Sequence, residues 1–153
     1  MSKVNLSFNE QSTKGLLNGV QKLAEAVRTT MGPGGSNVLI ETENRPILTK
    51  DGVTVAKAIN LTDPLENLGA QLVKEAASGA ADIAGDGTTT ATLLTYELYR
   101  HGIQMVNSGV NPVKLRKSLQ RWSERLEEKL MDHSTAVAVS YTHLRAHETL
   151  RYL

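Results

Sequence analysis

The 153-residue sequence lacks cysteine altogether, and aromatic residues make up only 4% of the chain. Without thiols the chain can form neither a disulfide bond nor a thiolate metal site. A long apolar run is missing as well, because charged residues or glycines interrupt the hydrophobic stretches. The sequence therefore predicts no membrane span and no signal peptide, and we expect a cytoplasmic protein that does not contact a membrane.

A charge excess of one sign is also lacking. The 17 Lys and Arg residues nearly balance the 16 Asp and Glu residues, which leaves a formal net charge of +1. The strong positive field that attracts nucleic acid is therefore absent, and we expect no nucleic-acid partner. The 40% hydrophobic content is enough for the core of one soluble domain.

Hydrophobic periodicity predicts a mainly α protein with four long helices. Apolar residues recur at steps of three and four within 12–31, 63–84, 90–108 and 112–133. Asp63 followed by Pro64 is typical of an N-cap and a first helical residue. Two short β-prone runs, 37–41 and 46–49, predict a small β-hairpin between the first two long helices.

The stretch AGDGTTTATLL at 84–94 carries more side-chain oxygens than a helix start requires. One acceptor would cap the helix, but Asp86, Thr88, Thr89 and Thr90 offer four side chains. Glycines flank Asp86, and a helix N-terminus attracts anions, so the stretch has the parts of a phosphate site in which Asp86 holds Mg²⁺. The spacing and the lysine of a Walker A loop are missing. Taken alone, these residues leave a phosphate site and a simple helix cap as alternatives.

Two further stretches contain turns that are ordinary when each is considered by itself. The first, TTMGPGG at 29–35, ends a helix in a Gly-Pro turn. The second, LTKDG at 48–52, places a cation and a carboxylate on a tight turn between a strand and a helix.

In combination the motifs are highly specific. TTMGPGGSNVLI, LTKDGVTVAKAI, ENLGAQLVKEAAS and AGDGTTTATLL, in this order, closely resemble the N-terminal part of the group I chaperonins, the GroEL type. The resemblance runs from about Val4 to about Ser134. It implies an ATP-driven protein-folding ring, of which residues 1–138 form part of the equatorial domain that binds nucleotide and makes ring contacts. Lys50 indicates group I, because archaeal and eukaryotic cytosolic chaperonins typically have asparagine there.

The resemblance also implies roles for individual residues. Lys50 would face the phosphates, Asp51 would be the catalytic carboxylate near the attacking water, and Asp86 would bind the metal ion. The other implied nucleotide-binding residues are Thr30, Met31, Gly32, Pro33, Gly87, Thr88, Thr89 and Thr90. The implied cofactors are ATP and Mg²⁺, with K⁺ as a further cation. The implied partners are other subunits of a homo-oligomeric ring, a co-chaperonin and unfolded client proteins.

The sequence departs from the family in two respects. Gly34 and Ser36 stand where many members carry Lys and Arg, which removes two positive charges near the first turn. Family members are also several times longer, so the resemblance implies only half of a nucleotide site here. We therefore expect the 153-residue chain alone to be a poor ATPase.

The string VSYTHLRAHET at 139–149 begins where the resemblance has ended. His143 and His147 are four residues apart, a spacing that would place both imidazoles on one helix face as a metal pair. The string also matches one reading frame of a transposase-type sequencing adapter. We therefore interpret residues 139–153 as a non-native tail.

Two functions from other classes remain as alternatives. A small phosphotransferase would use Asp86 for the metal and Asp51 as the base, but groups that bind adenine are not evident. A helical nucleic-acid module would use the basic residues of the last helix, which are Lys114, Arg116, Lys117, Arg121 and Arg125. No aromatic platform accompanies these charges and acidic residues follow them, which favours a solvated helix face.

Overall fold

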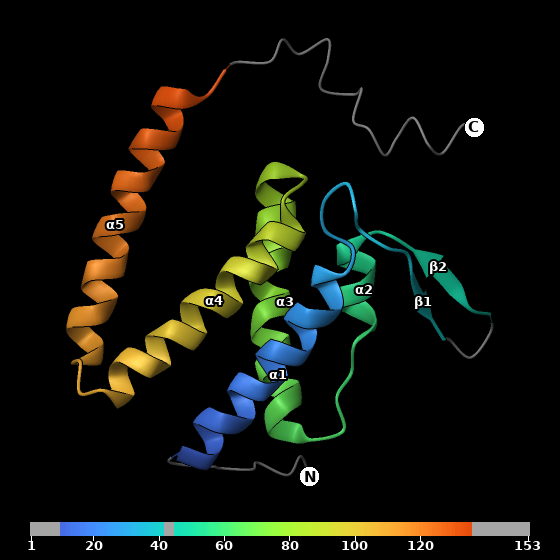
Figure 1. Ribbon diagram of the computed structural model, residues 1–153, viewed down its shortest axis with the longest axis horizontal. Helices are drawn as coiled ribbons and strands as arrows, with labels where there is room; N and C mark the ends of the chain where they lie inside the picture. Colours follow the sequence, from blue (N-terminus) through green and yellow to red (C-terminus); the bar gives the residue numbers. More distant parts are fainter. Residues whose placement is uncertain (1–9, 42–44, 136–153) are drawn as a thin grey trace. The chain divides into compact units, whose positions relative to one another are not determined.

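The computed structural model describes residues 10–41 and 45–135. Within these ranges the chain forms five α-helices and two short strands, so the predicted mainly α class with a small hairpin is confirmed. In chain order the elements are α1 (Glu10–Arg28), β1 (Val38–Ile40), β2 (Ile47–Thr49), α2 (Gly52–Ala58), α3 (Pro64–Ala84), α4 (Thr88–Asn107) and α5 (Pro112–His133) (Figure 1). No helix in these ranges has the length and apolar character needed to cross a bilayer.

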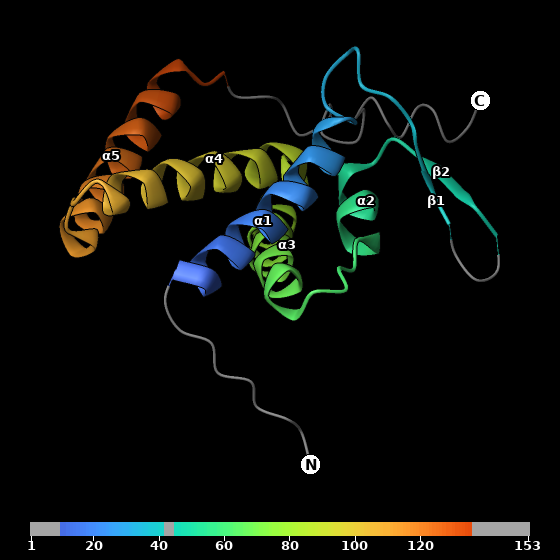
Figure 2. The same ribbon diagram turned by 60° about the horizontal axis from the view of Figure 1, so that its bottom comes forward.

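The chain divides into two compact units, Met1–Ser108 and Gly109–Leu153. In the first unit α1 packs along α3, and α4 contacts both of these helices (Figure 2). The short helix α2 contacts all three and also β1. The core is made from the apolar stripe of α1, which contributes Val20, Leu23, Ala24 and Val27, together with Val55 and Ala56 of α2, Ala70 and Val73 of α3, and Tyr96 of α4.

Two glycines allow α1 and α3 to pack with their backbones in contact. A Cβ atom added to Gly19 of α1 would overlap the main-chain carbonyl of Glu66, and one added to Gly69 of α3 would overlap that of Leu16. No side chain separates the helices at these two points. The close approach explains why glycines occur in the interiors of both helices, where they cost about 0.5–1 kcal/mol each relative to alanine.

The helix that precedes the candidate site begins as the sequence predicts. Asp63 is the N-cap of α3, and its Oδ1 accepts hydrogen bonds from the main-chain N–H groups of Leu65 at 2.9 Å and Glu66 at 3.0 Å. Pro64 is the first helical residue. The helix ends at Ala84, and its C-cap residue Gly85 has a φ of 67°, the left-handed conformation that glycine adopts without strain.

The predicted hairpin is confirmed, with strands slightly shorter than the β-prone runs. Strands β1 and β2 are antiparallel, with Val38 opposite Thr49, Leu39 opposite Leu48 and Ile40 opposite Ile47. Leu39 and Leu48 point to solvent and are 68% and 65% exposed. The hairpin leads directly into α2 and so fixes the position of the turn at residues 50–52.

The described part of the second unit contains the single helix α5. Asn111 is its N-cap and accepts from the N–H groups of Val113 at 2.9 Å and Lys114 at 3.2 Å. Pro112 is the first helical residue, and the helix ends at His133, within the range predicted from the sequence.

Candidate functional site

The three turns that the sequence singles out meet at Gly52, the first residue of α2. A Cβ atom added to this buried glycine would overlap the hydroxyl of Thr89 and would lie 3.3 Å from the hydroxyl of Thr30. Thr30 belongs to the turn after α1, Gly52 follows the Lys-Asp turn, and Thr89 lies in the first turn of α4. The structure therefore brings together segments that are about 20 to 60 residues apart in sequence.

The turn after α1 presents four of the predicted residues. Thr30 is buried, and its hydroxyl donates a hydrogen bond of 2.8 Å to the carbonyl of Val27 at the end of the helix. Met31, Gly32 and Pro33 are exposed, and Gly32 has a φ of 73°. A hydrogen bond of 2.7 Å from the N–H of Ser36 to the carbonyl of Thr29 closes the loop. A ligand can therefore approach these exposed residues of the turn.

The second turn carries Lys50 and Asp51, both of which are exposed. Asp51 is the N-cap of α2: Oδ1 accepts from the N–H of Val53 and Oδ2 from the N–H of Thr54, each at 3.1 Å. Oδ2 also accepts from the hydroxyl of Thr54 at 2.6 Å. These bonds hold the carboxylate in one orientation. The capping role of Asp51 was not among the sequence predictions, although Asp followed by Gly before a helix is a typical signal for it.

In the third turn, none of the threonines is the N-cap residue of the helix. The helix α4 starts at Thr88, two residues before the predicted start, because Gly87 with a φ of 80° makes the turn into the helix. No side chain caps the helix. Thr88 is buried, Thr89 is half-buried against Gly52, and Thr90 is exposed. The N–H groups of the first turn of α4 are therefore left without a side-chain acceptor from the N-cap residue.

Asp86 lies between two glycines in the left-handed conformation, Gly85 with φ 67° and Gly87 with φ 80°. Its Oδ1 accepts a 2.7 Å hydrogen bond from the N–H of Gly87, and the side chain is exposed. In the described ranges there is no group of three or more His, Cys, Asp and Glu residues that could hold a metal ion by themselves. A metal at Asp86 would therefore need further oxygen ligands from a bound molecule or from water. His143 and His147, whose spacing alone would suit a metal pair, lie outside the described residues.

Behind this site is a small hollow of about 10 Å³ between α2, α3 and α4, lined by Gly52, Thr88, Thr92 and Lys74 among others. Its size is enough for about one water molecule. Lys74 of α3 donates to the carbonyls of Lys57 and Ile59 at the C-terminal end of α2, and its partial burial lowers the pKa of the ammonium group. The sequence analysis predicted no role for Lys74 at this site. Its position beside the buried stripe of α3 is a weak indication of such a role.

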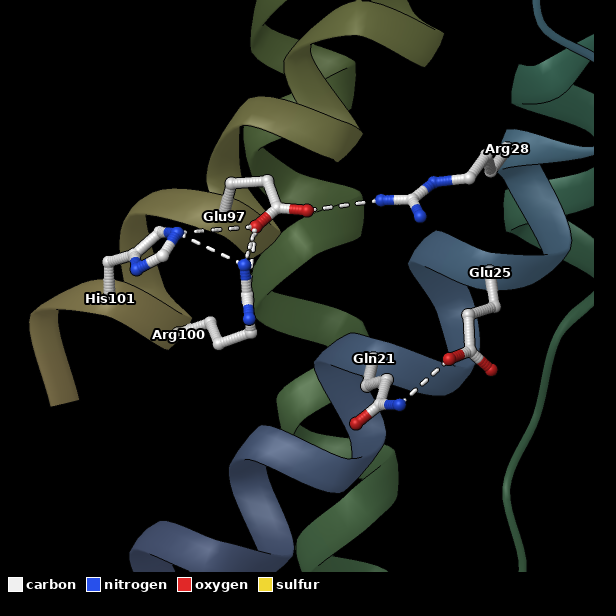
Figure 3. A network of polar contacts seen from close by, with 6 residues as sticks. All are labelled: Gln21, Glu25, Arg28, Glu97, Arg100 and His101. Atoms are coloured by element: carbon white, nitrogen blue, oxygen red, sulfur yellow. Dashed lines mark hydrogen bonds and ion pairs between the residues drawn. The ribbon is translucent and has the colours of Figure 1, made fainter. Parts of the chain in front are cut away.

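An ion-pair network joins α1 to α4 close to the turn that follows α1 (Figure 3). Glu97 of α4 accepts from Arg28, the last residue of α1, at 3.1 Å and from Arg100 at 2.7 Å. The Nε2 atom of His101 lies 3.7 Å from the same carboxylate. The hydrogen bond from Arg100, together with Arg28, holds the pKa of Glu97 below its usual value. The network connects the helix that ends beside Thr30 with the helix that begins at Thr88.

Two comparisons with known proteins point to the same family. Residues 23–152 match the model of the TCP-1/cpn60 chaperonin family. This range extends across residues 139–149, so the interpretation of that segment as a tail stays a prediction. Among solved structures, the chaperonin gp146 from the Pseudomonas aeruginosa bacteriophage EL, crystallised in the presence of ATP-BeFx, is similar with a TM-score of 0.76 and 28% identity. The match covers 90% of this chain and 24% of that one, so this chain spans about a quarter of its length.

Proposed function

Since this chain belongs to the TCP-1/cpn60 chaperonin family, we propose that it supplies the phosphate and magnesium half of an ATP site in a protein-folding ring of group I. The observation that carries the proposal is the meeting of Thr30, Gly52 and Thr89, which places two turns beside a helix N-terminus whose N-cap residue has no side-chain cap. A phosphate group would accept hydrogen bonds from the free N–H groups of α4 and would be stabilised by the positive end of the helix dipole.

Mg²⁺ fits the residues present. Asp86 offers an exposed carboxylate beside the start of α4, and only its Oδ1 is used in the bond to Gly87. Mg²⁺ in nucleotide sites is usually held by one or two carboxylates together with phosphate oxygens and water, so the absence of a protein-only cluster in the described ranges is consistent with this ion. When bound, Mg²⁺ would neutralise charge on the phosphates.

The other residues would position the nucleotide and the attacking water. Lys50 would bring a positive charge to the phosphates, and the turn of Thr30, Met31, Gly32 and Pro33 would contact the nucleotide. Asp51 would accept a hydrogen bond from the water, with its orientation fixed by the bonds from Val53 and Thr54. Phosphoryl transfer requires mainly this kind of positioning and charge stabilisation.

The remaining parts of the proposal concern the complete chaperonin. It would assemble into a homo-oligomeric ring, cooperate with a co-chaperonin, fold client proteins in the cytoplasm and use K⁺ as a further cation. The hairpin β1–β2, with Leu39 and Leu48 exposed, would reach a neighbouring subunit. The 153-residue chain, with half a site, would bind Mg²⁺·ATP weakly and hydrolyse it poorly.

An NMR titration of the ¹⁵N-labelled chain with ATP tests this proposal. With Mg²⁺ present, we expect the amide resonances of Gly32 and of residues 86–90 to shift at millimolar concentrations of ATP. The shifts should be much smaller when Mg²⁺ is replaced by EDTA. The matched control is Asp86→Asn, which keeps the side-chain shape and removes the charge that holds the metal. Shifts confined to other regions, or an Asp86→Asn response equal to that of the unchanged chain, would contradict the proposed site.

A further inference from the structure

The side chain of Lys74 links α3 to the C-terminal end of α2, which contacts α3 (Figure 1). Its ammonium group donates a hydrogen bond of 3.4 Å to the main-chain carbonyl of Lys57 and another to that of Ile59. Lys57 is in the last turn of α2, and Ile59 is the C-cap residue. The last carbonyls of a helix lack partners within the helix, and the helix dipole attracts a cation to this end. Lys74 therefore caps α2 from a neighbouring helix.

Main-chain carbonyls, and not a carboxylate, hold the ammonium group of Lys74 in place. Within residues 10–41 and 45–135, no Asp or Glu forms an ion pair with it. Lys74 is nevertheless half-buried. A lysine usually keeps its charged group in water while its stem covers apolar surface. Because partial removal from water is unfavourable for the ammonium group, the two carbonyls at the end of α2 are the contacts that offset this cost.

The helix α2 depends on its neighbours for its position. It has only seven residues, and an isolated helix shorter than about 12 residues is marginal in water. Gly52 packs against Thr89 of α4 at one end, and the buried Val55 and Ala56 contribute to the core. Lys74 of α3 binds the other end. The two ends of α2 are therefore held by different helices, α4 and α3.

The orientation of α2 determines where the turn with Lys50 and Asp51 lies, because this turn directly precedes the helix. At 1.5 Å per residue the helix is about 10 Å long. A tilt of about 6° at its C-terminal end would displace its N-terminal end by about 1 Å. A displacement of this size is enough to impair a site that works by positioning. The bonds from Lys74 therefore affect the two charged residues at the opposite end of α2.

Lys74 also belongs to the helix that leads to Asp86. The helix α3 continues from Lys74 to Ala84, and Asp86 follows the C-cap residue Gly85. About 15 Å of continuous helix separates Lys74 from Ala84. A side chain that ties α2 to α3 therefore fixes the turn with Lys50 relative to the turn with Asp86.

From these observations we propose that Lys74 is a positioning residue, whose bonds to the two carbonyls at the end of α2 hold this helix in the orientation in which Lys50 and Asp51 face the phosphates. Lys74 acts through this turn and does not itself touch the nucleotide. The expected effect on ATP rests on the proposed function, whereas the effect on the turn does not require nucleotide. The contacts of Lys74 described above join elements of the first unit, Met1–Ser108.

NMR of the ¹⁵N-labelled 153-residue chain without nucleotide tests the effect on the turn. Lys74→Met keeps an apolar stem and removes the donors. We expect the amide resonances of Val53 and Thr54, which donate to Asp51, to shift together with that of Ile59. A role confined to the end of α2 would shift Ile59 and leave Val53 and Thr54 in place.

Chemical restoration of the ammonium group separates the hydrogen bonds from other effects of the substitution. Because the chain has no cysteine, Lys74→Cys provides a unique thiol. Its thiolate displaces bromide from bromoethylamine in urea, which gives a side chain of the length of lysine with sulfur in place of one methylene group. After refolding, the Val53 and Thr54 resonances should return to their original positions. Alkylation with iodoethane is the matched control, since it adds the same two carbons without the amine and should not restore them.

The effect on the nucleotide is measured by titration with ATP in the presence of Mg²⁺. Lys74→Met should raise about fivefold the ATP concentration that gives half of the full shift at 86–90, which is comparable to the loss of one hydrogen bond. Lys57→Met removes the same charge from an exposed side chain at the same end of α2 and should leave this concentration unchanged. In a chain that already carries Lys50→Met, Lys74→Met should have no further effect.

Several outcomes would overturn the positioning role. Val53 and Thr54 resonances that do not move in Lys74→Met, or that bromoethylamine fails to restore, would show that the bonds of Lys74 do not orient the turn. A fivefold effect that persists beside Lys50→Met would show that Lys74 does not act through that turn. If the unchanged chain does not respond to Mg²⁺ and ATP, the proposed nucleotide site is wrong, and the Val53 and Thr54 resonances still decide whether Lys74 orients α2.

Discussion

Gly52 and Thr89 are in contact, and the space between them is too small for a methyl group: a Cβ atom on Gly52 would overlap the Thr89 hydroxyl. This contact joins the first residue of α2 to the first turn of α4. It also sets the distance between the turn that carries Lys50 and Asp51 and the turn that carries Asp86. The arrangement of the candidate site therefore depends on a residue without a side chain.

Gly52→Ala should lower the free energy of unfolding by about 1–3 kcal/mol, the usual cost of overpacking a closed site. Gly79→Ala is the matched control, since an added Cβ in that part of α3 meets nothing within 4 Å. The control should stabilise the chain by about 0.5–1 kcal/mol through helix propensity. Urea unfolding followed by circular dichroism measures both. Equal effects of the two substitutions would mean that Gly52 and Thr89 are not in contact.

Asp51 has two separable roles, one in stability and one in the proposed chemistry. Asp51→Ala removes the N-cap of α2 and should lower the free energy of unfolding by about 1 kcal/mol. Asp51→Asn retains a capping oxygen and should cost less. In a full-length chaperonin that contains this segment, both substitutions should slow ATP hydrolysis more than they weaken ATP binding. If Asp51→Asn keeps the original hydrolysis rate, the carboxylate has only the capping role.

Asp86 should behave in the opposite way, with little effect on stability and a large effect on activity. Its side chain is exposed, so Asp86→Ala should change the free energy of unfolding by no more than about 0.5 kcal/mol. In the full-length chaperonin the same substitution should abolish Mg²⁺-dependent ATP hydrolysis, measured as phosphate release. A variant that hydrolyses ATP at the original rate would exclude Asp86 as the metal ligand.

Glu97 should make the stability of the chain depend on pH in the acid range. Arg100 and Arg28 lower the pKa of Glu97 in the folded state below the ordinary value of 4.5, so the carboxylate stabilises the fold while it is ionised. That stabilisation is complete above pH 4.5 and is lost as the pH falls through the lowered folded-state pKa. Glu97→Gln should therefore be less stable than the original chain at pH 7, and the difference should shrink toward zero in strong acid. Urea midpoints at several pH values measure this, with Glu25→Gln as the control on α1.

The local elements could be predicted from the sequence because their signals are local. The spacing of Val20, Leu23 and Val27 is sufficient to define the buried face of α1, and the Asp63-Pro64 pair is sufficient to mark the start of α3. The hairpin was likewise predicted from its two β-prone runs. These features depend on residues within a few positions of one another.

The arrangement of the candidate site could be predicted only in part. The motifs indicate which turns matter, but the contact of Gly52 with Thr89 depends on how α1, α3 and α4 pack. The count of oxygens at Asp86 and Thr88–Thr90 left a simple helix cap open as an alternative. In the structure no side chain caps α4, because Gly87 turns the chain into the helix by its backbone conformation alone. Thr88 then becomes part of the packed interior.

The backbone contact of Gly19 with Glu66 has a consequence for the order of folding. The two residues are 47 positions apart, and the hairpin and α2 lie in the loop between them. The entropy cost of closing this loop is incurred when α1 and α3 meet. Once they meet, the helices fit closely and few other registers bring both glycines into contact. We therefore expect the α1–α3 pair to form the folding nucleus, with φ-values near Gly19 and Gly69 above those of α2, and to contain the amides that exchange most slowly with deuterium.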